Sequence, residues 1–91
     1  MNEIKCIVSG KVQGVSYRAY VEDRARDLAL VGFVQNMPDG TVAVVAQGVT
    51  DNLKDFVEAL HEGSVLAHVE GVATDWGTAK TLHEDFSIIY T

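Results

Sequence analysis

The chain of 91 residues is short enough for one small domain, 1–91, and its 47% hydrophobic content is sufficient for a single core. Thirteen acidic against seven basic residues give a net charge of −6, which opposes binding to nucleic acid or to an anionic membrane over the general surface. No apolar run approaches the roughly 20 residues that a membrane-spanning helix needs. Cys6 has no second cysteine to pair with, and no basic and apolar leader precedes the first strand pattern, so we expect a cytoplasmic protein.

Two patterns open the chain. Apolar residues alternate over residues 3–9, which predicts a first strand, and Cys6 lies on its apolar face as a buried small hydrophobe. Over residues 15–30, apolar residues recur at three- and four-residue spacing with charged residues between them, which predicts an amphipathic helix. Tyr17 and Tyr20 lie on its apolar face, and we interpret them as core and rim residues rather than as a stacking platform.

A hairpin follows the helix in the predicted structure. Residues 31–36 and 41–47 are rich in strand-forming side chains. Between them, the proline and glycine of Met37-Pro38-Asp39-Gly40 occupy positions typical of a type I turn, so the two runs should pair as an antiparallel hairpin.

The second half of the chain is predicted to contain a helix and two strands. Thr50 is a candidate N-cap of a helix with one apolar stripe, which Gly63 should end. Valines interrupted by Gly71 over residues 67–76 predict a strand with a bulge, and alternation over residues 86–90 predicts a short last strand.

This order of elements predicts the fold class α+β: a ferredoxin-like (split β-α-β) sandwich with an antiparallel sheet and both helices on one face. The pairing of the short C-terminal strand stays open. In this topology the strand over residues 31–36 runs parallel to the first strand, so its last residue, Asn36, ends level with the loop that follows the first strand.

That loop is the stretch GKVQGVSYR, residues 10–18. Its two glycines permit sharp turns and close approach to the main chain, and Arg18 adds a fixed positive charge in the first helical turn. A helix start already favours an anion, so a cation there is unfavourable unless an anion lies between the two. The loop is therefore interpreted as a cradle for a small anion, with the planar Arg18 guanidinium matching two phosphoryl oxygens.

Other sites are disfavoured by the residue pattern. The strands lack the exposed aromatic residues of an RNA-binding sheet, and His61, His68 and His83 have no metal-ligand spacing, so we expect them at surface or edge positions. The loop matches neither a nucleophile elbow nor a Walker or dinucleotide motif. Asn36 has two interpretations, as a turn-capping residue or as a side chain that reaches the anion held by the loop.

Two stretches resemble the signatures of the acylphosphatase family. Residues 10–18 resemble the first, G-x-V-Q-G-V-x-[aromatic]-R, and residues 32–48 resemble the second, G-F-V-x-N-x-x-x-G-x-V-x-x-x-x-x-G. The resemblance implies an enzyme that hydrolyses acyl phosphates, in which Arg18 binds the phosphate and Asn36 orients the attacking water. It also implies a small ferredoxin-like monomer that uses no metal or organic cofactor.

The expected site thus has Arg18 and Asn36 as catalytic residues and the loop amides as further phosphate-binding groups. These amides belong to Gln13, Gly14, Val15, Ser16, Tyr17 and Arg18. The expected partner is a small acyl phosphate, with no nucleic acid and no membrane. Two alternatives stay open: a non-catalytic phosphate- or anion-binding regulatory module, and the acyl-phosphate-cleaving part of a larger carbamoyl-transfer enzyme. The sequence does not rank the possible acyl groups.

Overall fold

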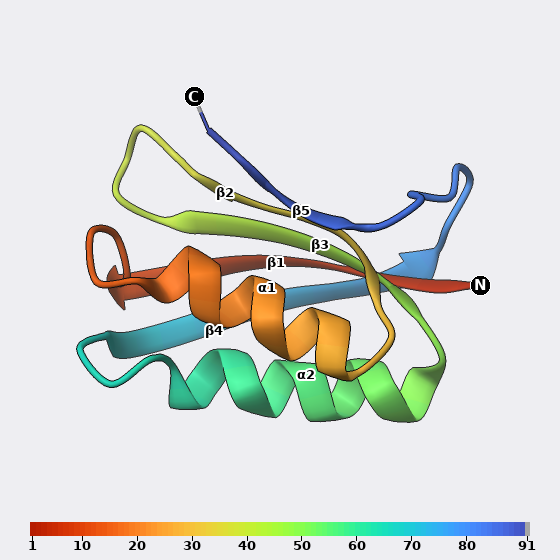
Figure 1. Cartoon of the computed structure of the whole chain (residues 1–91), viewed down its shortest axis with the longest axis horizontal. Coiled ribbons are helices and arrows are strands. Elements are labelled where there is room, and N and C mark those ends of the chain that lie inside the picture. Colours follow the sequence, from red (N-terminus) through yellow and green to blue (C-terminus); the bar gives the residue numbers. More distant parts are fainter. Residues whose placement is uncertain (91) are drawn as a thin grey trace.

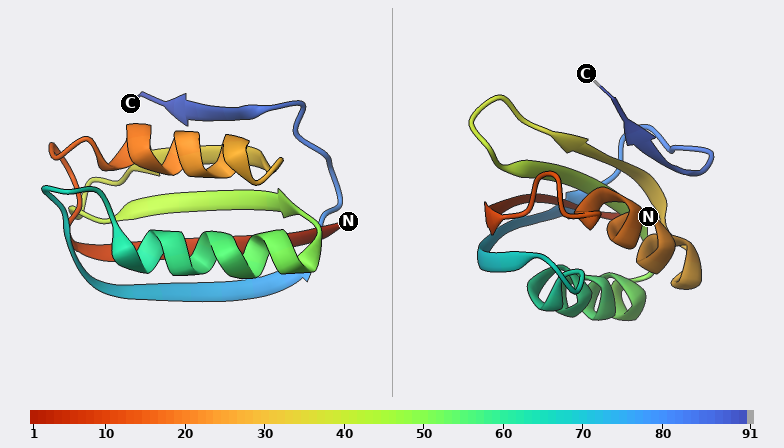
Figure 2. Two further views of the ribbon diagram at one scale, coloured as in Figure 1. Left: turned by 60° about the horizontal axis from the view of Figure 1, so that its bottom comes forward. Right: turned by 60° about the vertical axis from the view of Figure 1, so that its left-hand side comes forward.

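The computed structural model describes residues 1–90 and confirms the predicted fold class, with two helices on one face of a five-stranded sheet (Figures 1 and 2). The order of the strands across the sheet is β4-β1-β3-β2-β5. In chain order the elements are β1 (Asn2–Lys11), α1 (Tyr17–Asp27), β2 (Val31–Asn36), β3 (Val42–Gly48), α2 (Thr50–Glu62), β4 (His68–Thr78) and β5 (Phe86–Ile89).

The short strand β5 adds a parallel edge to an otherwise antiparallel sheet. Strands β1 and β4, β1 and β3, and β2 and β3 pair antiparallel, as predicted. Strand β5 pairs parallel with β2, and Phe86 lies opposite Gly32. This settles the pairing that the sequence leaves open and makes the sheet mixed.

The core lies between the sheet and the helices. On the helix-facing side, Ile4, Cys6 and Val8 are paired with Ala46, Val44 and Val42 across β1 and β3, and all six side chains are buried. The helices contribute further fully buried apolar side chains, which are Tyr17, Val21, Ala25, Leu53, Phe56 and Leu60. In β1, the alternation that predicted the strand is therefore the pattern of its burial.

Helix α1 is shorter than the prediction of residues 15–30 at both ends. Ser16 has a left-handed backbone with φ 61°, so regular helix begins only at Tyr17. Ala29 also has a positive φ, of 55°, and the helix has already ended at Asp27. The predicted capping role of Thr50 is wrong as well: the N-cap of α2 is Val49, and the Thr50 hydroxyl accepts a hydrogen bond from the Asn2 side chain instead.

The predicted bulge lies where β1 and β4 leave their common register. The pairing shifts between Ser9 and Gly10, because Ser9 lies opposite Gly71 and Gly10 opposite Val69. Gly10 has a φ of 116°, and a Cβ atom there would lie 2.2 Å from the main-chain oxygen of His68. Only glycine fits this close approach without movement of the backbone.

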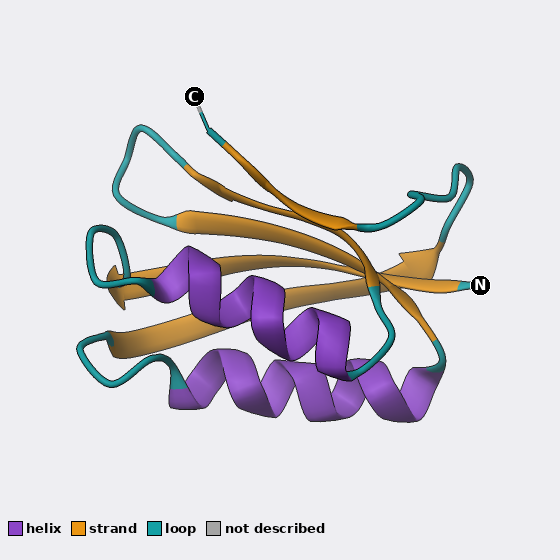
Figure 3. Ribbon diagram, viewed as in Figure 1, coloured by secondary structure: helices purple, strands orange, loops and turns teal. Residues whose placement is uncertain are grey.

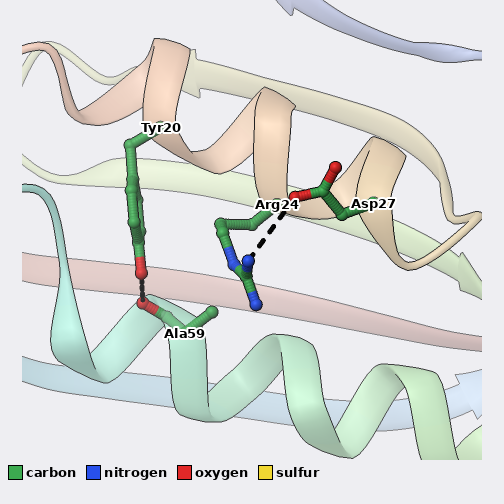
Figure 4. Close-up of polar contacts among 4 residues, drawn as sticks. All are labelled: Tyr20, Arg24, Asp27 and Ala59. Carbon is green, nitrogen blue, oxygen red and sulfur yellow. Dashed lines mark hydrogen bonds and ion pairs between the residues drawn. The ribbon is translucent and has the colours of Figure 1, made fainter.

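Two tyrosine hydroxyls connect α1 to the last turn of α2. Tyr17 donates a hydrogen bond to the main-chain oxygen of Leu60 at 2.8 Å. Tyr20 donates one to the main-chain oxygen of Ala59 at 2.7 Å, as Figure 4 shows. On the same helix, Arg24 pairs with Asp27 at 3.5 Å. Ala59 O also accepts from Gly63 N at 3.1 Å, whereas the carbonyl of Leu60 belongs to the last turn, where carbonyls have no amide donor within the helix, so the Tyr17 hydroxyl supplies it with a donor.

The connections between elements gather at the two ends of the sheet (Figure 3). The loop after β1, the turn between β2 and β3, and the connection from α2 to β4 lie together at one end (Figures 1 and 3). The connection from β4 to β5 lies at the other end. Among residues 1–90, no helix has the length and apolar character required to cross a membrane.

Candidate active site

A pocket of about 170 Å³ opens at the end of the sheet that carries the loop after β1. Its walls come from that loop, from the start of α1, from the end of β2 and from the C-terminal strand. The residues that line it are Val12, Gly14, Ser16, Tyr17, Arg18, Ala19, Asn36, Ile88 and Tyr90. The pocket therefore brings together the two residues, Arg18 and Asn36, that the sequence analysis places in one site.

Buried and exposed residues alternate along the loop that follows β1. Val12, Val15 and Tyr17 are buried, whereas Gly14 and Ser16 between them are exposed. Gly14 and Ser16 have left-handed backbones, with φ of 72° and 61°. In anion-binding nests, residues of opposite backbone handedness turn successive N–H groups toward one side, and left-handed residues such as these are one part of that arrangement. The loop spanning residues 12–16 is called the cradle loop below.

The start of helix α1 has neither of the groups that usually neutralise a helix N-terminus. Its first turn contains no acidic residue, and the side chain of the N-cap residue Ser16 makes no capping hydrogen bond. The first N–H groups of a helix have no acceptor within it, and the helix dipole adds partial positive charge there. The start of α1 thus leaves N–H donors available beside the cradle loop.

The Arg18 guanidinium is held over the pocket by contacts that leave its charge uncompensated. Its Nη1 donates to the main-chain oxygen of Ile89 at 3.3 Å, and its Cζ lies 4.8 Å from the centre of the Tyr90 ring. Within residues 1–90, neither of the two ion pairs includes Arg18. A cation oriented by an aromatic ring and a carbonyl keeps donors free for an anionic ligand.

Asn36 ends β2 with its side-chain oxygen buried. Asn36 lies opposite Val42 in the hairpin, and the turn after it is closed by Gly40 N donating to Met37 O at 3.1 Å. The Asn36 Oδ1 atom is buried and has no hydrogen-bond partner among the described residues. A buried acceptor without a partner destabilises a fold by about 1–3 kcal/mol, so this atom is expected to meet a donor that a ligand or water supplies.

The predicted loop residues fall into two groups. Gly14, Ser16, Tyr17 and Arg18 line the pocket, whereas Gln13 and Val15 are not among its described lining residues. Val15 is a buried anchor, and the Gln13 side chain bonds to the β2–β3 turn. The phosphate-binding role of the amides in this loop stays a prediction.

Sequence reasoning missed the contribution of the C-terminal strand. Ile88 and Tyr90 line the pocket and Ile89 holds Arg18, because β5 lies beside β2 at the edge of the sheet. No local pattern signals this placement, since the short strand shows only alternation. The alternation of Phe86 and Ile88 indicates a strand without naming its neighbour.

The remaining chemistry-bearing side chains lie away from the pocket. His61, His68 and His83 are exposed, as expected, and residues 1–90 contain no group of three or more histidine, cysteine or acidic side chains arranged to hold a metal ion. Cys6 is buried in the core as predicted, and burial raises the pKa of its thiol, which lies 3.5 Å from the Thr74 hydroxyl.

The chain is similar to known acylphosphatases over nearly its whole length. The acylphosphatase family model matches residues 4–88. A protein named acylphosphatase from Marinobacter nauticus is 46% identical over 86 residues, which are 94% of each chain. One of the same name from Salinibacter ruber is 43% identical over 81 residues, or 89% of this chain and 85% of the relative.

The chain is also similar to solved structures of acylphosphatases. The crystal structure of acylphosphatase from Bacillus subtilis superimposes with a TM-score of 0.96 at 37% identity, covering 99% of this chain and 100% of the other. An acylphosphatase from Coxiella burnetii gives a TM-score of 0.90 at 37% identity, with coverage of 96% and 90%. HypF from T. kodakarensis, at 24% identity, shares only the fold, and the match covers 12% of that protein. From the family match and these relatives, the chain belongs to the acylphosphatase family of hydrolytic enzymes.

Proposed function

We propose that the chain hydrolyses the carboxyl–phosphate bond of acyl phosphates, with Arg18 and the amides of residues 13–18 binding the phosphoryl group and Asn36 orienting the attacking water. One observation carries the assignment of roles. Asn36, whose side-chain Oδ1 is buried and has no partner among the described residues, lines the same pocket as Arg18. An acceptor of this kind is suited to a hydrogen of water, whereas the N–H groups of the loop and of Arg18 are suited to phosphoryl oxygens.

The leaving group explains why the proposed site needs no general acid. The reaction releases a carboxylate, whose conjugate acid has a pKa of about 4 to 5, so it departs at neutral pH without a proton. None of the described residues that line the pocket is a histidine, aspartate or glutamate. The Tyr17 hydroxyl already donates to Leu60 O, and burial raises the pKa of Tyr17, so it is not an acid for this step.

In the proposed reaction the water oxygen attacks phosphorus as the bond from phosphorus to the acyl oxygen breaks. The bonding electron pair leaves with the carboxylate. The water proton passes to a phosphoryl oxygen of the substrate, which yields dihydrogen phosphate from the dianionic substrate. The transition state is loose, with charge on the equatorial oxygens, so donors fixed in place before the reaction stabilise it without rearrangement.

Phosphate release from a series of acyl phosphates tests the proposed activity. Wild-type protein should release inorganic phosphate from acetyl phosphate and benzoyl phosphate and should be inhibited by inorganic phosphate. Inhibitor or ligand binding without any phosphate release would instead support the alternative of a non-catalytic anion-binding module. The series also ranks acyl groups, which the pocket does not identify.

We further propose a cytoplasmic monomer that uses no metal or organic cofactor. The net charge of −6 supports the expectation that nucleic acid is not a partner, because the phosphate backbone would be repelled. Size-exclusion chromatography with light scattering checks the monomer. A dimer that persists on dilution would contradict this part of the proposal.

A further inference from the structure

The side chain of Gln13 joins the cradle loop to the turn between β2 and β3. Its Nε2 atom donates to the main-chain oxygen of Met37 at 2.8 Å and to that of Thr41 at 2.9 Å. A glutamine amide has two hydrogens on this nitrogen, so both are used. Met37 N also donates to Thr41 O at 2.9 Å, which means that Gln13 binds the two residues that close the turn.

This connection ends next to Asn36. Asn36 is the last residue of β2, and Met37 follows it directly. The hairpin register ends where Asn36 lies opposite Val42, so residues 37–41 lie beyond the paired strands. The two Gln13 bonds connect the loop to this turn: one reaches Met37, the residue after Asn36, across 24 positions of sequence, and the other reaches Thr41 across 28.

We propose that Gln13 is a positioning residue: its side-chain amide holds Asn36 and the water it orients in line with a phosphoryl group bound by the cradle loop. This inference rests on the proposed function of Asn36. In-line attack requires the water and the phosphorus to be held in one geometry, and a displacement of about 1 Å lowers the rate about a hundredfold. Gln13 acts through Asn36 and does not itself touch the reacting atoms.

A second side chain holds the same loop without reaching Asn36, and it supplies a matched control. Ser64 Oγ donates to the main-chain oxygen of Val15 at 3.0 Å, which ties the loop to the connection between α2 and β4. That connection contributes none of the described residues lining the pocket. Loss of the Ser64 bond therefore loosens the loop on the side away from the hairpin.

The experiment compares Gln13→Ala and Ser64→Ala by kcat on benzoyl phosphate, by the inhibition constant of inorganic phosphate, and by thermal midpoint. Gln13→Ala should lower kcat about ten- to a hundredfold and change the phosphate constant less than about twofold, because the loop amides and Arg18 remain. Ser64→Ala should lower the thermal midpoint about as much as Gln13→Ala does, but its kcat should stay within about twofold of wild type. Equal losses of kcat in the two variants would make Gln13 a merely structural residue.

Gln13→Glu keeps the shape of the side chain and removes both donors, so it should show the same fall in kcat in a protein that folds. Wild-type kcat in Gln13→Glu would overturn the proposal.

A double-mutant cycle separates this inference from the proposed function. In the Asn36→Ala background, Gln13→Ala should lower kcat by less than about twofold, because no asparagine remains to be positioned. If Gln13→Ala lowers kcat by the same factor in both backgrounds, Gln13 does not act through Asn36, and the inference fails. The role of Asn36 itself is tested separately by the single variant Asn36→Ala.

Discussion

Asn36 and Gln47 are side-chain amides on neighbouring strands at opposite ends of the sheet, and they differ in their hydrogen bonds. The buried Gln47 donates to Glu3 Oε2 and to Thr81 O, both at 2.8 Å, and its Oε1 accepts from His83 N at 3.0 Å. The Asn36 Oδ1 is also buried but has no partner among residues 1–90. The Gln47 amide therefore has protein partners for its nitrogen and its oxygen, whereas the Asn36 oxygen has none among the described residues.

The difference separates a structural role from a proposed catalytic one. Gln47 fastens the connection between β4 and β5 to the sheet, and every group it uses there is satisfied. An unsatisfied buried acceptor destabilises the fold by about 1–3 kcal/mol, and such a loss is typical of positions retained for function. The comparison predicts that substitution of Gln47 will lower the stability of the fold, whereas substitution of Asn36 will lower kcat.

The largest effect on activity is expected at Arg18, the charged residue that lines the same pocket as Asn36. Arg18→Ala should lower turnover of benzoyl phosphate about a thousandfold or more and abolish inhibition by inorganic phosphate, because the cradle loses its fixed cation. Arg18→Lys should recover little, since an ammonium does not form the planar two-point contact. Normal phosphate affinity in Arg18→Ala, measured by isothermal titration calorimetry, would contradict the proposed role of Arg18 in binding phosphate.

A reciprocal effect on stability is expected when the two amides are replaced. Gln47→Leu should lower the free energy of unfolding by about 2 kcal/mol, because His83 N and Thr81 O lose their partner, while kcat stays near wild type. Asn36→Ala should leave the free energy of unfolding unchanged or slightly higher, because it removes an acceptor that is already unpaired. Urea unfolding measures both. The comparison fails if Asn36→Ala is the more destabilised variant.

A smaller effect is expected from Tyr17, a buried residue whose hydroxyl has a hydrogen-bond partner within the protein. Burial raises the pKa of Tyr17 above its usual value, and its hydroxyl donates to Leu60 O. The folded state therefore holds this proton more tightly than the unfolded state, so the contribution is present below about pH 10 and is lost as the pH rises further. Denaturant unfolding should show stability falling above about pH 10, and Tyr17→Phe should show a shallower fall. An unchanged pH dependence in Tyr17→Phe would assign the loss to other groups.

The smallest effect is expected from metal removal. Dialysis against EDTA should leave kcat within experimental error, because the proposed leaving group needs no Lewis acid and Arg18 supplies the positive charge. The assay is phosphate release before and after chelation. A loss of activity that Mg²⁺ or Zn²⁺ restores would contradict a cofactor-free site.

Local sequence patterns predicted most of the fold and the two principal residues of the candidate site. The hairpin over the 37–41 turn and the end of α2 at Gly63 follow from turn and capping chemistry, and both are confirmed. The meeting of Arg18 and Asn36 in one pocket follows from the parallel directions of β1 and β2.

The missed features depend on contacts between residues that are far apart in the sequence. The Gln13 and Gln47 side chains bond to groups 24 to 36 positions away, and Gln47 also bonds to Glu3 across 44 positions, which leaves no periodic signature. The Thr50 hydroxyl, predicted to cap α2, is bonded to Asn2 from the start of the chain. Such pairings are decided by packing of whole elements and not by the propensity of a segment.

The measurement that tests the account most directly is the kinetics of Asn36→Ala with benzoyl phosphate as substrate and inorganic phosphate as competitive inhibitor. If Asn36 orients water, kcat should fall about a hundredfold or more while the inhibition constant of phosphate stays within about twofold of wild type. If the inhibition constant rises in proportion to the fall in kcat, Asn36 binds the phosphoryl group, and its proposed role with water is wrong.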